Sequence, residues 1–163
     1  MLFKAVSISN KTPDLIARPL LHLMRHALEL GYKFTLDEIR KLDGGRFTEA
    51  GHNLGRLHRM IGEEWKAAIE RHGITDSGFE EHYANTEKAM QEFERLDPNG
   101  DSFRYPTHRN GDPCFAYFES VDLLEINNWF DEGMILLRHT ADVLEDWQRQ
   151  VQDALEAMEW ARG

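Results

Sequence analysis

Two arginines and two histidines stand close together in the segment GRFTEAGHNLGRLH, which covers residues 45–58. A guanidinium group binds phosphate through two parallel hydrogen bonds, and an imidazole transfers protons near neutral pH. Arg46 and His52 therefore supply the two groups that metal-free RNA cleavage requires, a clamp for the scissile phosphate and an acid–base group for the attacking 2′-OH. The alternative is structural, because polar residues such as His52 and Asn53 often cap the start of a helix.

A second group of basic side chains lies further along the chain, at residues 104–109, where no acidic residue occurs. The residues of interest there are Arg104, Tyr105, His108 and Arg109. Cations beside an aromatic ring predict a surface that binds an RNA, a nucleotide or a partner protein. The alternative is that Arg104 and Tyr105 anchor the surrounding connection by bonding to carbonyl groups at helix ends.

The remaining reactive side chains form no recognisable metal, cofactor or nucleophile motif. His22 and His26 stand one helical turn apart, yet no third histidine or carboxylate lies at a diagnostic spacing from them. Cys114 is the only cysteine, and neither a GxGxxG nor a GxxxxGK[ST] phosphate loop occurs. We therefore expect neither a metal ion nor an organic cofactor.

The net charge limits the classes of partner. With 19 Lys and Arg against 29 Asp and Glu, the formal charge is −10, which opposes nonspecific binding to nucleic acids. Residues 40–59 are an exception, because bases outnumber acids there. The single cysteine fits a reducing compartment, and no apolar stretch predicts a leader or a membrane span. We expect a cytoplasmic protein that makes no membrane contact.

The elements that would position these residues are helices. Apolar residues recur at three- and four-residue steps in four segments, which predicts helices over about 14–42, 50–73, 79–97 and 122–160. Only residues 2–8 show the alternation of a short strand, and residues 102–118 form a long irregular connection. The length of 163 residues fits one domain over 1–163. The sequence therefore predicts a single all-α domain.

The last predicted helix is unusually long. It begins with a pair that resembles a capping box, Asp122 and Glu125, and its apolar stripe continues for roughly ten turns. Because a small bundle cannot cover a helix of this length, the part from Trp147 to Trp160 is expected to protrude or to pack on a second chain. We therefore expect a homodimer.

Three segments together resemble bacterial proteins of the HEPN superfamily: HALELGYK at 26–33, GHNLGRL at 51–57 and LDPNGDSFRYP at 96–106. Their order matches a histidine- or arginine-preceded ALEL-x-x-K helix, a GH[DN]L helix start and a later RYP segment. The resemblance implies an up-and-down bundle of four to five helices, commonly dimeric. Many members are metal-independent ribonucleases in toxin–antitoxin or defence systems, and others are noncatalytic modules that bind RNA, nucleotides or proteins.

The resemblance gives the shared residues two interpretations. In the ribonucleases an arginine and a histidine are separated by four to six residues, and Arg46 and His52 meet that spacing, although the family pattern places the pair later in the bundle. In the structural interpretation, Glu29 pairs with Lys33 one turn away and is reached by His52 across the bundle. Such a network, with Asn53 at the same helix start, would fix the helix register.

Two functions of different class stay open. The sequence favours a noncatalytic HEPN-like module that binds RNA, a nucleotide or a partner protein through Arg104, Tyr105, His108 and Arg109. The alternative is a metal-independent endoribonuclease, in which Arg46 clamps the scissile phosphate and His52 transfers the proton.

Overall fold

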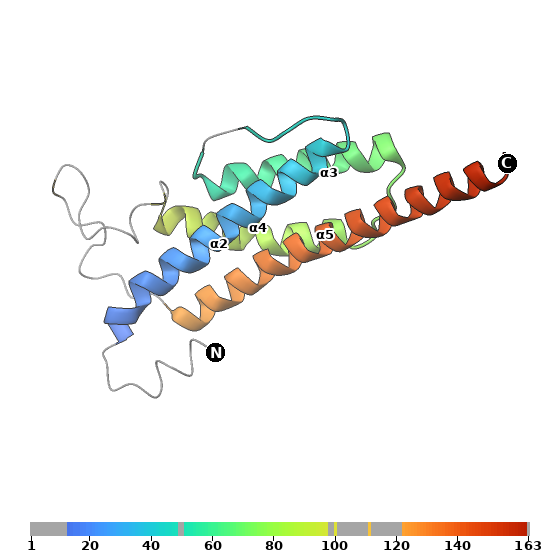
Figure 1. Cartoon of the computed structure of the whole chain (residues 1–163). Helices are drawn as coiled ribbons and strands as arrows, with labels where there is room; N and C mark the ends of the chain where they lie inside the picture. The colour runs from blue at the N-terminus through green and yellow to red at the C-terminus, as the bar shows by residue number, and fades with distance from the viewer. Residues whose placement is uncertain (1–12, 49–50, 98–99, 101–110, 112–121, 163) are drawn as a thin grey trace.

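The chain folds as a helical bundle. The computed structural model describes residues 13–48, 51–97, 100, 111 and 122–162. These residues form four helices and no strand: α2 (Pro13–Lys41), α3 (Leu54–His72), α4 (Phe79–Leu96) and α5 (Leu123–Trp160). Figure 1 shows α5 as the longest element. The predicted all-α bundle with a long C-terminal helix is confirmed, whereas the strand expected at 2–8 lies outside the described residues.

The helices do not simply alternate in direction. Each of α2 and α4 packs against both α3 and α5. The connection from α2 runs back along the bundle before α3 begins, as Figure 1 shows, so α2 and α3 point the same way. Tyr32 contacts His58, and further along both helices Arg40 contacts Glu64. Only α3, α4 and α5 follow an up-and-down order, because a connection of twelve residues is long enough to span the return.

The helix boundaries follow from local chemistry. Gly73 ends α3 with a φ of 65°, a left-handed conformation that glycine adopts without a Cβ clash. Asp122 caps α5 by accepting a hydrogen bond from the main-chain N–H of Leu124 at 2.8 Å. Pro19 lies inside α2, in its second turn. The predicted bounds of α2, α4 and α5 differ from the structural ones by at most one residue, whereas α3 begins at Leu54, four residues after its predicted start.

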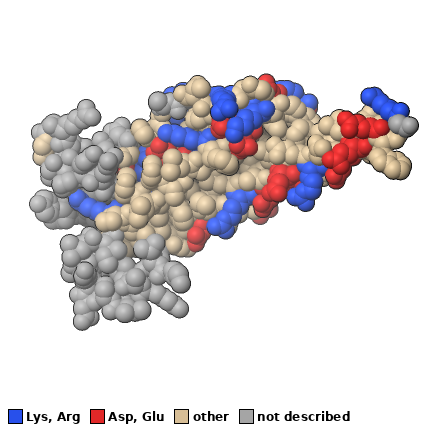
Figure 2. Space-filling model, viewed as in Figure 1, with Lys and Arg blue, Asp and Glu red and all other residues tan. Residues whose placement is uncertain are grey.

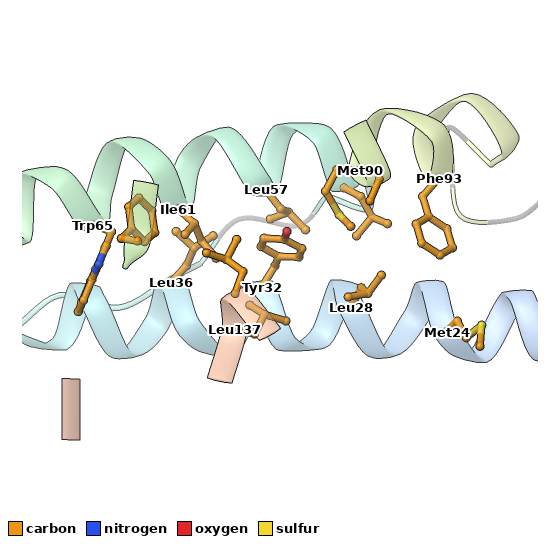
Figure 3. Packing of buried hydrophobic residues seen from close by; sticks show 14 of the residues in the cluster. Met24, Leu28, Tyr32, Leu36, Leu57, Ile61, Trp65, Met90, Phe93 and Leu137 are labelled. Carbon is orange, nitrogen blue, oxygen red and sulfur yellow. The ribbon is translucent and has the colours of Figure 1, made fainter. Parts of the chain in front are cut away.

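The core is one layer of apolar side chains between α2 and the other helices. Figure 3 shows side chains of α2 and α3 meeting between the two helices, with residues of α4 and α5 closing the sides. Leu28, Leu36, Leu54, Ile61 and Trp65 are fully buried. This packing holds the start of α3 and the end of α4 against α2, which is where the polar residues of interest lie.

The last part of α5 leaves the bundle. Trp147 still contacts His72 at the end of α3, with ring centroids 5.5 Å apart. Beyond it every described side chain is exposed, and Figure 1 shows this part of the helix extending past the other three. The predicted protrusion is therefore present. Among the described helices, none combines the length and the apolar character that crossing a bilayer requires.

Candidate functional site

Arg25 lies at the centre of a buried polar network, at the end of the bundle where α3 begins and α4 ends. Only 2% of its surface is exposed. Its guanidinium donates hydrogen bonds to Glu29 Oε2 at 3.2 Å, to the main-chain oxygen of Asp97 at 3.1 Å and to the main-chain oxygen of His52. The carboxylate of Asp97 lies 3.4 Å from Nε. A buried cation is stable only when it is paired, and these bonds supply the partners of Arg25. The same bonds connect α2 to the end of α4 and to the segment before α3.

The carboxylate of Glu29 joins Arg25 to two further basic groups. Its Oε1 accepts a hydrogen bond from Lys33 Nζ at 2.7 Å and lies 2.8 Å from His52 Nδ1. Burial raises the pKa of the Glu29 carboxyl, but the hydrogen bonds from Lys33 and His52 outweigh burial and hold the pKa below its usual value. The Glu29 side chain is 4% exposed and that of His52 is 67% exposed. A buried carboxylate therefore holds an exposed imidazole.

Asn53 fixes the start of α3 in two ways. Its Oδ1 accepts a hydrogen bond from the main-chain N–H of Arg56 at 2.6 Å, which is the usual N-cap bond. Its Nδ2 donates to one carboxylate oxygen of Glu94 in α4. The other oxygen of Glu94 accepts the main-chain N–H of Gly55 at 3.3 Å. The first turn of α3 is therefore bonded to α4 as well as capped.

Gly100 packs directly against Arg25. Its φ is +78°, and a Cβ built on it would lie 2.7 Å from Arg25 Nη1. Its N–H bonds to the main-chain oxygen of Asp97 at 3.4 Å. A side chain at this position would be strained by the backbone conformation and would displace the guanidinium. The contacts of Arg25 thus bring together the three segments that carry the family resemblance, 26–33, 51–57 and 96–106.

Of the four residues that the sequence assigned to a structural polar network, the structure joins Glu29, Lys33 and His52 to one another. The fourth residue, Asn53, is bonded to Glu94 and Arg56 instead. It does not join Arg46 to His52. Arg46 is exposed and makes no hydrogen bond to a described residue, whereas His52 is bonded to Glu29. The sequence placed both residues near one helix start, but their side chains have different surroundings.

The second set of predicted site residues cannot be placed in the fold. Arg104, Tyr105, His108 and Arg109 lie outside the described residues, as does Cys114. His22 and His26, for which the sequence offers no third metal ligand, stack on each other with ring centroids 5.9 Å apart. Within the described ranges, no group of three or more His, Cys, Asp or Glu side chains is arranged to hold a metal ion.

Sequence reasoning missed Arg25 and Asp97. Arg25 lies in α2 between the buried residues Leu21 and Leu28, one position after Met24. A charge beside an apolar stripe usually reaches solvent, so the spacing alone does not reveal a buried pair. The available signal was Asp97, because an acidic residue at the end of a helix opposes the helix dipole and calls for a cationic partner. That partner is seventy-two residues away in the chain, and only the folded bundle identifies it.

A second polar cluster, also missed, lies at the opposite end of the bundle around Asp76. One carboxylate oxygen accepts the Nε1–H of Trp65 at 2.9 Å, and the other lies 2.7 Å from His139 Nε2 on α5. Burial raises the pKa of Asp76, but the hydrogen bonds from His139, Trp65 and the N–H of Gly78 outweigh it and lower the pKa. Asp76 also accepts the N–H of Phe79, so it fixes the start of α4.

His58 is a third buried polar residue, in the second turn of α3. Its Nδ1 lies 3.0 Å from the hydroxyl of Tyr32, and its ring stacks on that of Tyr83 with centroids 4.1 Å apart. Nε2 is buried and has no hydrogen-bond partner. Burial, followed by the charge of Arg59, lowers the pKa of His58 to about 4. His58 is therefore a neutral core residue at physiological pH.

The comparisons with known proteins assign no family. No protein-family model, no curated protein and no solved structure matches this chain. The candidate function therefore rests on the geometry described above and on the sequence resemblance.

Proposed function

We propose that this protein is a noncatalytic interaction module of HEPN-like architecture that binds a protein, and that its partner is a second copy of the chain. The observation that carries the proposal is the protruding part of α5. Every side chain from 148 to 162 is exposed, including Val151, Leu155 and Met158 at 38%, 52% and 57%. A helical end of this length is marginally stable alone in water, and burial against a partner stabilises it.

The protruding part of α5 is amphipathic. Val151, Leu155 and Met158 follow one another at steps of four and three residues, so they share one face of the helix. Asp153 and Glu156 lie on the other side of the helix. An apolar stripe with charges opposite is the pattern of a helix that packs against another protein surface.

The charge distribution favours a protein over a phosphate ligand. Arg40 donates to both carboxylate oxygens of Glu64, the shortest contact being 2.6 Å. Lys41 pairs with Asp37 at 2.9 Å and with Glu38 at 2.5 Å. Part of the local positive charge of residues 40–59 is therefore neutralised within the chain. In the polar network, all three nitrogens of Arg25 are engaged by protein oxygens.

Sedimentation velocity across a broad concentration range tests the proposal. We expect wild type to form a dimer and Leu155→Asp to be monomeric, because the substitution places a charge on the apolar stripe. Trp160→Asp is the matched control, since Trp160 is exposed but lies on the opposite side of α5 from Val151, nine residues away. A wild type that remains monomeric at every concentration, or a dimer that Leu155→Asp leaves intact, would overturn the proposal.

One observation favours endoribonuclease activity as a second candidate. His52 is exposed, and its Nδ1 is bonded to Glu29. The other ring nitrogen, Nε2, is not bonded to Glu29. Such an imidazole can accept the proton of a ribose 2′-OH as that oxygen attacks the adjacent phosphorus. The bond from phosphorus to the 5′-oxygen breaks, this oxygen takes a proton from the imidazolium of His52 or from water, and a 2′,3′-cyclic phosphate remains. Arg46 would have to approach the scissile phosphate from its exposed position.

Incubation of the purified protein with structured and unstructured RNA in EDTA distinguishes the two functions. The noncatalytic proposal predicts intact RNA with wild type and with His52→Ala. Cleavage by wild type that is lost in both His52→Ala and Arg46→Ala, while both variants keep the wild-type circular dichroism spectrum, would establish the nuclease. Arg162→Ala is a control, because it removes an exposed arginine far from His52.

A further inference from the structure

An exposed apolar stripe runs along the outer side of α2. Leu23, Leu30 and Phe34 are 58%, 52% and 64% exposed, and Ala27 lies between them on the same face. Figure 2 shows a broad region without charged residues across the middle of this side of the molecule. Large apolar side chains gathered on one helix face mark an interaction surface rather than scattered surface residues.

A groove between α2 and α5 continues this stripe. Phe34, Thr35 and Glu38 form one wall, and Ala141, Leu144, Glu145 and Gln148 form the other, around a volume of about 130 Å³. Because Glu38 and Gln148 line the same groove, the end of α2 is level with the point at which α5 leaves the bundle. Along the long axis of the bundle, the apolar stripe of protruding α5 therefore begins where the apolar stripe of α2 ends.

We propose that protruding α5 of one copy lies antiparallel across the α2 stripe of a second copy, with Val151, Leu155 and Met158 packing on Phe34, Leu30 and Ala27. This inference rests on the proposed function, since it supplies the receiving surface of the homodimer. The spacings match: the steps of four and three residues from Val151 to Met158 equal the steps from Phe34 back to Ala27. Two helices whose apolar residues recur at equal steps pack these residues in matching layers along one interface.

The charges select the antiparallel orientation. Residues 15–28 hold no acid and include Arg18, His22 and His26, whereas residues 150–161 hold no base and include Glu159, which flanks the apolar stripe of α5. Antiparallel packing places the acidic end of α5 beside the basic half of α2. Parallel packing would place it beside Asp37 and Glu38, and like charges at an interface disfavour that arrangement.

The α2 stripe receives protruding α5 of a second copy and not protruding α5 of the same chain. Protruding α5 is the continuous extension of a 38-residue helix, so it points away from its own α2 stripe. Within one chain α2 and α5 run side by side in the same direction, with Leu28 at Gly133 and Leu137 at Gly31. A two-fold axis then lets each copy contribute its protruding helix and receive that of its partner, which closes the assembly as a dimer.

Disulfide trapping tests the register in the full chain carrying Cys114→Ser. Leu30→Cys combined with Leu155→Cys is expected to give a covalent dimer under mild oxidation, because the proposed register places these positions opposite each other. Leu23→Cys combined with Val151→Cys is the matched control. Position 23 lies eleven residues from position 34, the expected neighbour of 151, which is about 16 Å along a helix and too far for a disulfide.

Sedimentation velocity on the reduced proteins separates two kinds of failure. A monomeric wild type would overturn the proposed function and this inference together. If wild type is dimeric but Leu30→Cys/Leu155→Cys is trapped no faster than the control pair, the register is wrong while the homodimer stands. Leu30→Asp and Leu155→Asp are both expected to raise the dimer dissociation constant at least about tenfold, which corresponds to 1.4 kcal/mol. Retention of the wild-type constant by Leu30→Asp would exclude the α2 stripe as the receiving surface.

Discussion

The guanidinium of Arg25 on α2 is bonded to the last residues of α4 through Asp97, with Nε 3.1 Å from the main-chain oxygen and 3.4 Å from the carboxylate. Both residues are almost fully buried. The pair therefore connects two segments that are seventy-two residues apart, in an environment where an unpaired charge is costly.

Removal of this guanidinium should destabilise the bundle strongly. Arg25→Met keeps the length and apolar stem of the side chain but leaves Glu29 and Asp97 without their buried cation. We expect the free energy of unfolding, measured by urea denaturation, to fall by about 3–5 kcal/mol. Arg95→Met removes an exposed arginine of α4 and should change it by less than about 1 kcal/mol. Equal stability of Arg25→Met and wild type would show that the network contributes nothing to folding.

The two roles of Asn53 can be separated by substitution. Asn53→Ala removes both the cap of α3 and the bond to Glu94, and should cost about 1–2 kcal/mol of unfolding free energy. Asn53→Asp keeps a capping oxygen but places a carboxylate against that of Glu94. We therefore expect a loss of stability that becomes smaller at acidic pH, where one of the two carboxylates is protonated. Thermal denaturation of both variants at neutral and acidic pH provides the comparison. A loss in Asn53→Asp that does not depend on pH would contradict the role of Glu94.

His58 should make the fold sensitive to mild acid. Its pKa is about 4 in the folded chain and 6.5 ordinarily, so below pH 6.5 the unfolded chain binds a proton that the folded chain excludes. Its contribution to the free energy of unfolding therefore falls from pH 6.5 to about 4, by about 3 kcal/mol in total. Glu29 and Asp76, whose pKa values are lowered, add losses only below about pH 4.5, the ordinary carboxyl range.

His58→Leu isolates this effect. The variant lacks the titrating ring and should lose most of the slope of stability against pH between 6.5 and 4.5, as measured by urea denaturation at several pH values. His72→Leu is a suitable comparison, because His72 is only partly buried and lies 3.1 Å from Asp43 at the exposed end of α3. A pH slope that His58→Leu leaves unchanged would assign the acid sensitivity to other groups.

Gly62 should tolerate no side chain. A Cβ at this position would lie 2.6–2.7 Å from the ring of Tyr83, which stacks on His58. We expect Gly62→Ala to destabilise the fold by about 1–3 kcal/mol, despite the better helix propensity of alanine, because a rigid ring cannot give way locally. Gly31→Ala is the control, since its Cβ would meet only the end of the flexible Leu137 side chain. Thermal denaturation should show the smaller loss for Gly31→Ala.

The local features of the helices were determined by the sequence. Apolar residues at helical spacing predicted the four helices, and the capping residue Asp122 predicted where α5 begins. The start of α3 was predicted at residue 50 and lies at Leu54, after the cap Asn53. The excess length of α5 was also evident, because an apolar stripe that continues past the end of every other helix has no partner in the same chain. These properties depend on residues that lie a few positions apart in the chain, so the spacing of apolar residues in the sequence predicts them.

The tertiary structure decided which polar groups meet. The parallel course of α2 and α3 depends on a connection whose direction no periodicity encodes, and it places His52 against Glu29 instead of Arg46. Arg25 is buried because Asp97 neutralises it from the end of α4, and the side chain of Asp76 is buried because Trp65 on α3 and His139 on α5 bond to it. A charge is stable in the interior only when its partners surround it, and those partners come from distant parts of the chain.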